Sequence, residues 1–152
     1  MNLFVEILEI VSAGFLGLFV GALLAEGALF VPYWKTLEAE TFFILHKEYG
    51  PRLYRFFAPL TIAATFLAVV TAVVCILTAQ NGRWATMIAG ILAATMIGIY
   101  FLYFKTANAK FAVGKISADD LKDELNRWEK WHWVRVIVGI VAFAASLIGL
   151  SR

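Results

Sequence analysis

Three residues of this chain carry the side chains of a metal-binding facial triad, which consists of one carboxylate and two imidazoles. Glu26 is the only charged residue in the apolar run 10–34, which is long enough to cross a membrane. A charged group at the bilayer centre costs about 3 kcal/mol or more, so such a residue usually faces a polar interior and has a function. The only histidines are His46 and His132. Two histidines and a carboxylate can hold ferrous iron and leave positions open for oxygen. We therefore predict a divalent metal, with iron favoured over copper, bound by these three residues.

Each of the three residues also has a structural interpretation, which the sequence leaves open; for His132 it is an aromatic belt at the membrane interface beside Arg135. Glu26 could be held neutral or pair with Arg135 or a lysine to stabilise a helix bundle, and proton handling is a second functional use open to it. His46 lies in the segment 37–49, which we interpret as a short amphipathic helix whose aromatic face includes the imidazole. On that face a histidine is more often packed in a core than bound to a ligand. A haem between His46 and His132 is a less favoured alternative, because haem ligands in bundles usually lie deeper within helices than the loop position of His46.

A second group of polar residues is expected near Glu26. Trp128, His132 and Arg135 share one helical face at the start of the last apolar run. Asn108 follows the third apolar run on the same side of the membrane. We predict that Glu26, Asn108, His132 and Arg135 converge in the bundle interior. There Arg135 and Asn108 would have catalytic roles, orienting ligands or binding an oxyanion.

The composition is that of an integral membrane protein. Hydrophobic residues make up 62% of the 152 residues and charged residues only 16%, far from the averages of soluble domains. The net charge of +2 is small and scattered, so nucleic acid is not an expected partner. We predict an all-α fold, a four-helix membrane bundle with short amphipathic cytoplasmic helices, formed by one domain over residues 1–152. The predicted spans are approximately 4–32, 56–80, 84–105 and 133–151.

Charge also predicts the orientation of the bundle. Of the 13 Lys and Arg residues, only Arg83 and Arg152 fall outside the two long loops and the segments beside them. Because Lys and Arg concentrate on the cytoplasmic side, both long loops are predicted to be cytoplasmic and both termini outside. The five tryptophans all fall near predicted membrane boundaries, as aromatic belts do.

Small residues recur at helical spacing in the first apolar run. This stripe consists of Gly14, Gly17, Gly21, Ala25 and Ala28. Such stripes let a neighbouring helix approach closely. We interpret the stripe as packing within the chain rather than as a dimer face, although a homo-oligomer or a larger membrane complex remains open. The expected partners are membrane lipid and a lipophilic small molecule.

Several segments together resemble the four-helix membrane family named after anthrone oxygenase. They are GALFVP at 27–32, FFAPL at 56–60, Asn108, and the pattern formed by Trp128, Trp131, His132 and Arg135. The tryptophan-rich pattern is the most specific of these. The resemblance implies a four-helix membrane fold and the oxidation of a flat phenolic polyketide at a methylene carbon, with oxygen as the oxidant. The sequence leaves two function classes open. One is an oxygenase-like membrane oxidoreductase that acts on a lipophilic substrate, and the other is a non-enzymatic accessory subunit of a larger complex.

Overall fold

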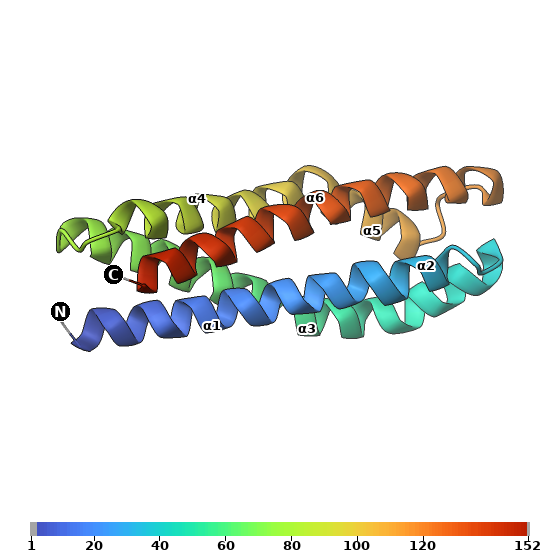
Figure 1. The fold of residues 1–152 in the computed structure, drawn as a ribbon. Helices are drawn as coiled ribbons and strands as arrows, with labels where there is room; N and C mark the ends of the chain where they lie inside the picture. Colours follow the sequence, from blue (N-terminus) through green and yellow to red (C-terminus); the bar gives the residue numbers. More distant parts are fainter. Residues whose placement is uncertain (1–2, 152) are drawn as a thin grey trace.

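The chain forms an elongated antiparallel bundle of helices (Figure 1), here described from a computed structural model over residues 3–151. No strand occurs in this part of the chain. The elements in order are α1 (Leu3–Ala25), η1 (Glu26–Phe30), α2 (Val31–Trp34), α3 (Ala39–Leu77), α4 (Arg83–Ile99), η2 (Tyr100–Phe104), α5 (Lys105–Ala112) and α6 (Ala118–Leu150). The start of α1 and the end of α6 lie at the same end of the bundle (Figure 1).

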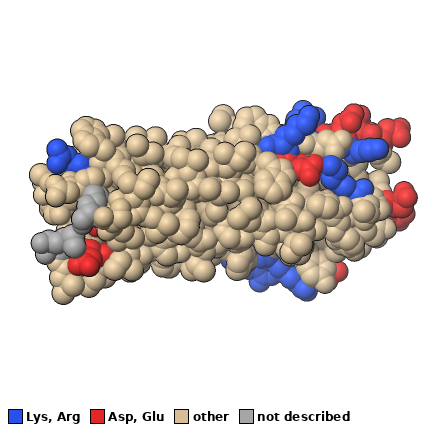
Figure 2. Space-filling model, viewed as in Figure 1, with Lys and Arg blue, Asp and Glu red and all other residues tan. Residues whose placement is uncertain are grey.

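Four continuous helical segments are long and apolar enough to cross a membrane. They are Leu3–Trp34, Ala39–Leu77, Arg83–Ala112 and Ala118–Leu150. The predicted all-α membrane four-helix fold is therefore confirmed, and the protein is an integral membrane protein. Most charged side chains gather at the end of the bundle that holds the loops 35–38 and 113–117, which we call the loop end (Figure 2). That the loop end faces the cytoplasm stays a prediction from the charge distribution.

The sequence of α6 explains where it begins. The side-chain oxygen of Ser117 accepts a hydrogen bond from the backbone N–H of Asp120, at 3.1 Å. This bond satisfies one of the N–H groups that a helix start leaves without a partner. Asp119 and Asp120 lie where the helix dipole favours negative charge. The helix then continues from Ala118 through almost all of the last predicted span.

Two of the long segments contain a π-helical turn, η1 and η2. At the end of η1 the N–H of Val31 bonds to the carbonyl of Glu26, five residues back, and Pro32 follows directly. A proline ring clashes with the carbonyl four residues before it, which favours such a local widening. In η2 the N–H of Lys105 bonds to the carbonyl of Tyr100 in the same way. Single π turns are frequently found at functional sites, and both of these turns lie beside the pocket described below.

The second long helix begins earlier than predicted. We expected a short helix over 37–49 separate from the span at 56–80, but α3 runs unbroken from Ala39 to Leu77. Pro51 removes only one backbone hydrogen bond. The burial of Phe42 against Trp34 and Phe111 holds the first turns of α3 in line.

The small-residue stripe faces outward rather than into the bundle, so its predicted role is wrong except at Gly17. A Cβ added at Gly14 or Gly21 would meet no atom within 4 Å, whereas one at Gly17 would lie 3.1 Å from the ring of Phe143. The close helix contact forms elsewhere. A Cβ at Gly139 on α6 would lie 2.9 Å from Val20 on α1.

Candidate functional site

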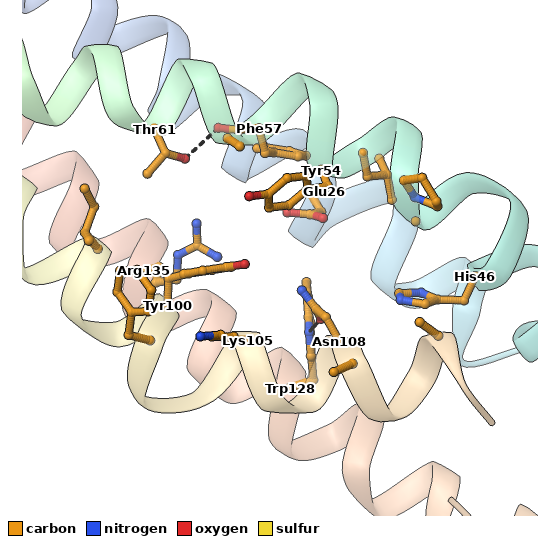
Figure 3. A pocket seen from close by; sticks show the side chains of 18 of the residues that line it. Glu26, His46, Tyr54, Phe57, Thr61, Tyr100, Lys105, Asn108, Trp128 and Arg135 are labelled. Atoms are coloured by element: carbon orange, nitrogen blue, oxygen red, sulfur yellow. Dashed lines mark hydrogen bonds between the residues drawn. The ribbon is translucent and has the colours of Figure 1, made fainter. Parts of the chain in front are cut away.

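A pocket of about 580 Å³ lies towards the loop end, lined by α3 on one side and by α4, η2 and α5 on the other (Figure 3). Residues of η1 and α6 also line it. Its volume is in the range of sites that bind small molecules. Most of the lining is apolar or aromatic. The polar side chains among the lining residues are Glu26, His46, Lys47, Tyr54, Thr61, Tyr100, Lys105, Asn108, Trp128 and Arg135.

Glu26 and Arg135 supply the buried charges of this pocket. Both side chains are only 7% exposed, and both point into the same space (Figure 3). The guanidinium carbon of Arg135 lies 4.6 Å from the centre of the Phe104 ring, a cation–π contact. Its Nε is buried without a hydrogen-bond partner in the described part of the chain. Because buried polar atoms are rarely left unpaired, this N–H is a donor that the surrounding helices leave unused.

His132 lies directly behind Glu26 and is 0% exposed. Its Nε2 is 2.8 Å from the carbonyl oxygen of Leu23. A carbonyl can only accept a hydrogen bond, so we assign the proton to Nε2 and the lone pair to Nδ1. That Nδ1 has no hydrogen-bond partner among the described residues and lies 3.7 Å from Oε2 of Glu26. The imidazole therefore presents its lone pair to the carboxylate.

The indole ring of Trp128 packs against one face of the His132 imidazole. The two rings stack, with centroids 4.9 Å apart and an interplanar angle of 8°. The indole N–H of Trp128 donates a 2.9 Å hydrogen bond to Oδ1 of Asn108. The hydrogen bond from Trp128 to Asn108 thus orients the indole, and the stacked indole in turn orients the His132 ring. The structure brings Glu26, Asn108, His132 and Arg135 to one place, from η1, α5 and α6.

Two tryptophans do not form the predicted interface belt. Trp34 and Trp128 are buried, with ring centroids 5.6 Å apart, and both line the pocket. Their spacing near a membrane boundary was typical of a belt, but the side chains turn inward and form an aromatic wall. The remaining tryptophans, Trp84, Trp131 and Trp133, are exposed.

His46 lies at the loop end of the pocket, apart from Glu26 (Figure 3). Its half-buried ring packs 5.5 Å from Phe42 and 5.3 Å from Phe111, centroid to centroid. Between residues 3 and 151, no group of three or more His, Cys, Asp or Glu side chains could hold a metal ion. The structure therefore does not support the predicted triad of Glu26, His46 and His132. It pairs only Glu26 with His132, and the second nitrogen of His132 is engaged by the backbone.

Sequence reasoning missed several residues of the pocket. The side chains of Tyr54 and Tyr100 point into it from opposite walls (Figure 3). Lys47 and Lys105 also line it. Tyr100 belongs to η2, and Tyr54 lies two turns before Thr61 on α3. The sequence could have singled out these two tyrosines, because a hydroxyl within or beside an apolar span requires a polar partner or water.

The fold and this pocket define a class of protein: a small four-helix membrane protein with an intramembrane acid and arginine in a pocket of ligand size. The anthrone oxygenase family model matches residues 51–145, which is more than half of the chain. The chain therefore belongs to the anthrone oxygenase family, which indicates oxygenase-like function at the family level. Asn108, His132 and Arg135 lie within the matched region, while Glu26 and His46 lie before it. Searches of the curated proteins and of the solved structures found no match.

The packing of His132 against η1 makes a testable prediction at Gly27. A Cβ at this position would lie 2.9 Å from Cδ2 of His132, whose ring has no free space. We expect Gly27→Ala to destabilise the protein by about 1–3 kcal/mol, as overpacking does, and to displace the imidazole from Leu23. Thermal unfolding in lipid nanodiscs measures this effect. The matched control is Gly98→Ala, where a Cβ would meet nothing within 4 Å. Equal unfolding temperatures for the two variants would contradict the packing described for His132.

Proposed function

We propose that this protein is a small membrane oxygenase that oxidises a flat, phenolic, lipophilic substrate at a methylene carbon, with molecular oxygen as the oxidant. The observation that carries the proposal is the pocket itself. It combines a buried carboxylate, Glu26, and a buried guanidinium, Arg135, within a mostly apolar space that membrane helices surround. Membership of the anthrone oxygenase family supports the same reaction class.

The lining of the pocket suits a flat aromatic molecule. Trp34, Phe57, Tyr100 and Trp128 lie around the pocket and offer ring faces and edges to a polycyclic substrate. Tyr54 and Asn108 add hydroxyl and amide groups that could hydrogen-bond to phenolic oxygens. Molecular oxygen is itself apolar and dissolves in the hydrocarbon around the helices, so it needs no separate channel.

Glu26 and Arg135 have complementary roles in this chemistry. A methylene group between two aromatic rings and conjugated with a carbonyl is acidic, because loss of a proton gives an extended aromatic oxyanion. In our proposal the Glu26 carboxylate accepts that proton as a general base. Arg135, whose side chain lines the pocket, stabilises the charge that develops on the substrate oxygen.

His132 acts on Glu26 rather than on the substrate. Its Nδ1 lone pair lies 3.7 Å from Oε2 of Glu26, within about 1 Å of a hydrogen bond. A small movement would let Nδ1 accept a hydrogen bond from Glu26 when Glu26 holds the proton. His132 is therefore a positioning residue, itself oriented by Leu23 and Trp128.

The overall reaction balances without an external reductant. The methylene carbon loses two hydrogens and four electrons and becomes a ketone carbon. One molecule of oxygen takes up the four electrons. One of its atoms becomes the ketone oxygen, and the other leaves as water with the two hydrogens. The proposed reaction contains no metal-bound step, because of the three predicted metal ligands the described structure brings together only Glu26 and His132. Bound iron and haem stay predictions, which metal analysis of the purified protein tests.

Oxygen uptake with a model anthrone tests the proposal. We would reconstitute the protein in lipid nanodiscs, add a dihydroxyanthrone, and follow oxygen with an electrode and the quinone by its absorbance. We expect one oxygen consumed for each quinone formed, at a rate proportional to the protein concentration. Empty nanodiscs give the uncatalysed rate, since anthrones autoxidise slowly. A rate no higher with protein than without it would favour the alternative, a non-enzymatic accessory subunit.

A further inference from the structure

The charges around the pocket are unbalanced. Four charged residues line it: Lys47, Lys105 and Arg135 are cationic, and Glu26 is the only acid. Whether Glu26 is ionised or protonated, the lining carries a positive net charge. A concave site of one sign raises the local concentration of ligands with the opposite sign.

The two lysines have no carboxylate partner among the described residues, although acids are available nearby. Lys35 pairs with Glu129 at 2.7 Å, and Arg127 pairs with Glu124 at 2.6 Å. Lys47 and Lys105 are exposed and form no such pair, and the only contact of the Lys105 ammonium that the structure gives is with the Phe101 ring, 5.7 Å from its centre. Both ammonium groups can therefore pair with an anionic ligand.

The pocket is elongated along the helices. Its lining residues extend along α3 from His46 to Ile62 and along the opposite wall from Ile97 to Ala112. At 1.5 Å per residue, each stretch covers roughly 22–24 Å. The long axis therefore runs from the loop end, with its charged side chains, towards the apolar middle of the bundle.

The apolar part of the pocket is bordered by side chains on the outer surface of the bundle. Ile62 on α3 and Phe101 on η2 both line the pocket, and they are 63% and 59% exposed. In a membrane these exposed side chains face lipid. A lipophilic molecule could thus reach the pocket sideways, between α3 and the segment formed by α4 and η2.

From this charge and shape we propose that the substrate is an acidic amphiphile. Its carboxylate pairs with Lys47 at the loop end of the pocket or with Lys105 on the opposite wall, and its flat apolar body extends along the pocket past Glu26 and Arg135. This inference rests on the proposed function for the reacting group, and it adds the substrate class and orientation. The exposed lysines then act in recognition, whereas the buried pair of Glu26 and Arg135 acts in the chemistry.

A matched pair of ligands tests the inference by binding alone. We would measure dissociation constants for an anthraquinone carboxylic acid and for its carboxamide, which has nearly the same shape without the charge. Quenching of tryptophan fluorescence reports binding, because Trp34 and Trp128 line the pocket. We expect the acid to bind about tenfold more tightly than the amide to the wild-type protein at low salt. Added salt should reduce this preference, since both lysines are exposed.

Lysine variants locate the preference. In Lys47→Gln/Lys105→Gln the ratio of the two dissociation constants should fall to about one. The control Lys110→Gln/Lys115→Gln removes two exposed lysines that do not line the pocket, and it should keep the wild-type ratio. Equal binding of acid and amide to the wild type, or a preference that survives in the pocket variant, would overturn the inference.

The same measurements separate this inference from the proposed function. Binding without preference, together with anthrone oxidation, would overturn the acidic substrate and leave the oxygenase in place. A preference for the acid without any oxidation would overturn the oxygenase and leave the acidic ligand class in place. Failure of both ligands to quench the tryptophans would count against the pocket as a binding site for this class of molecule.

Discussion

Glu26→Gln is expected to lower the rate of anthrone oxidation by about 10²- to 10⁴-fold, the usual contribution of a positioned general base. Glutamine has nearly the same shape and can hydrogen-bond, but it cannot accept a proton at this position. The substrate should still bind, because the aromatic walls of the pocket are unchanged. The measurement compares kcat for oxidation with the dissociation constant of the anthraquinone carboxamide.

The chain offers a close control for this substitution. Glu9 on α1 is also 7% exposed and lies in the other half of the bundle, where the thiol of Cys75 donates to it at 3.3 Å. Glu9→Gln removes a buried intramembrane acid without touching the pocket. It should leave kcat within a fewfold of wild type, even if stability changes. A comparable loss of activity in both variants would show that Glu26 acts through folding alone.

Arg135→Met is expected to lower kcat by about 10²- to 10³-fold, the cost of removing one donor to a developing oxyanion. Methionine can still pack against Phe104, which the guanidinium covers at 4.6 Å. Arg135→Lys keeps the charge but loses the planar set of donors, so it should recover only part of the activity. Steady-state kinetics in nanodiscs, with KM and kcat separated, measures both variants.

A purely structural arginine would give a different pattern. Arg127→Met serves as the control, since that side chain is exposed and pairs with Glu124 outside the pocket. It should behave as wild type. If Arg135→Met changed unfolding temperature but not kcat, Arg135 would stabilise the bundle without taking part in the reaction.

The fold followed from the sequence because hydropathy and capping act locally. Each predicted span lies almost entirely within one of the observed helical segments, and Ser117 caps the start of α6 through a local hydrogen bond. The π turns could not be predicted, because a one-residue widening leaves the apolar pattern nearly unchanged. Yet η1 and η2 are the elements that carry Glu26 and Tyr100 into the pocket.

The candidate site followed only in part. The rarity of an acid in hydrocarbon singled out Glu26, and the shared helical face singled out Trp128, His132 and Arg135. The role of His46 depended on how α3 packs, because its neighbour Phe42 lies one turn away on the same helix but Phe111 comes from α5, far away in the sequence. Tyr54 and Tyr100 point into the pocket from opposite walls, and they too come from helices far apart in the sequence. Such pairings depend on tertiary contacts that no local pattern records.

The source of the oxygen atom in the product tests the central claim most directly. Wild-type protein in nanodiscs would be given the dihydroxyanthrone under oxygen gas labelled with a heavy isotope, and the quinone would be analysed by mass spectrometry. The proposed function predicts one labelled atom in each new carbonyl, formed far faster than in empty nanodiscs and suppressed in Glu26→Gln. Label from water instead of oxygen gas, or labelled quinone formed no faster with wild-type protein than without it, would contradict an oxygenase site in this pocket.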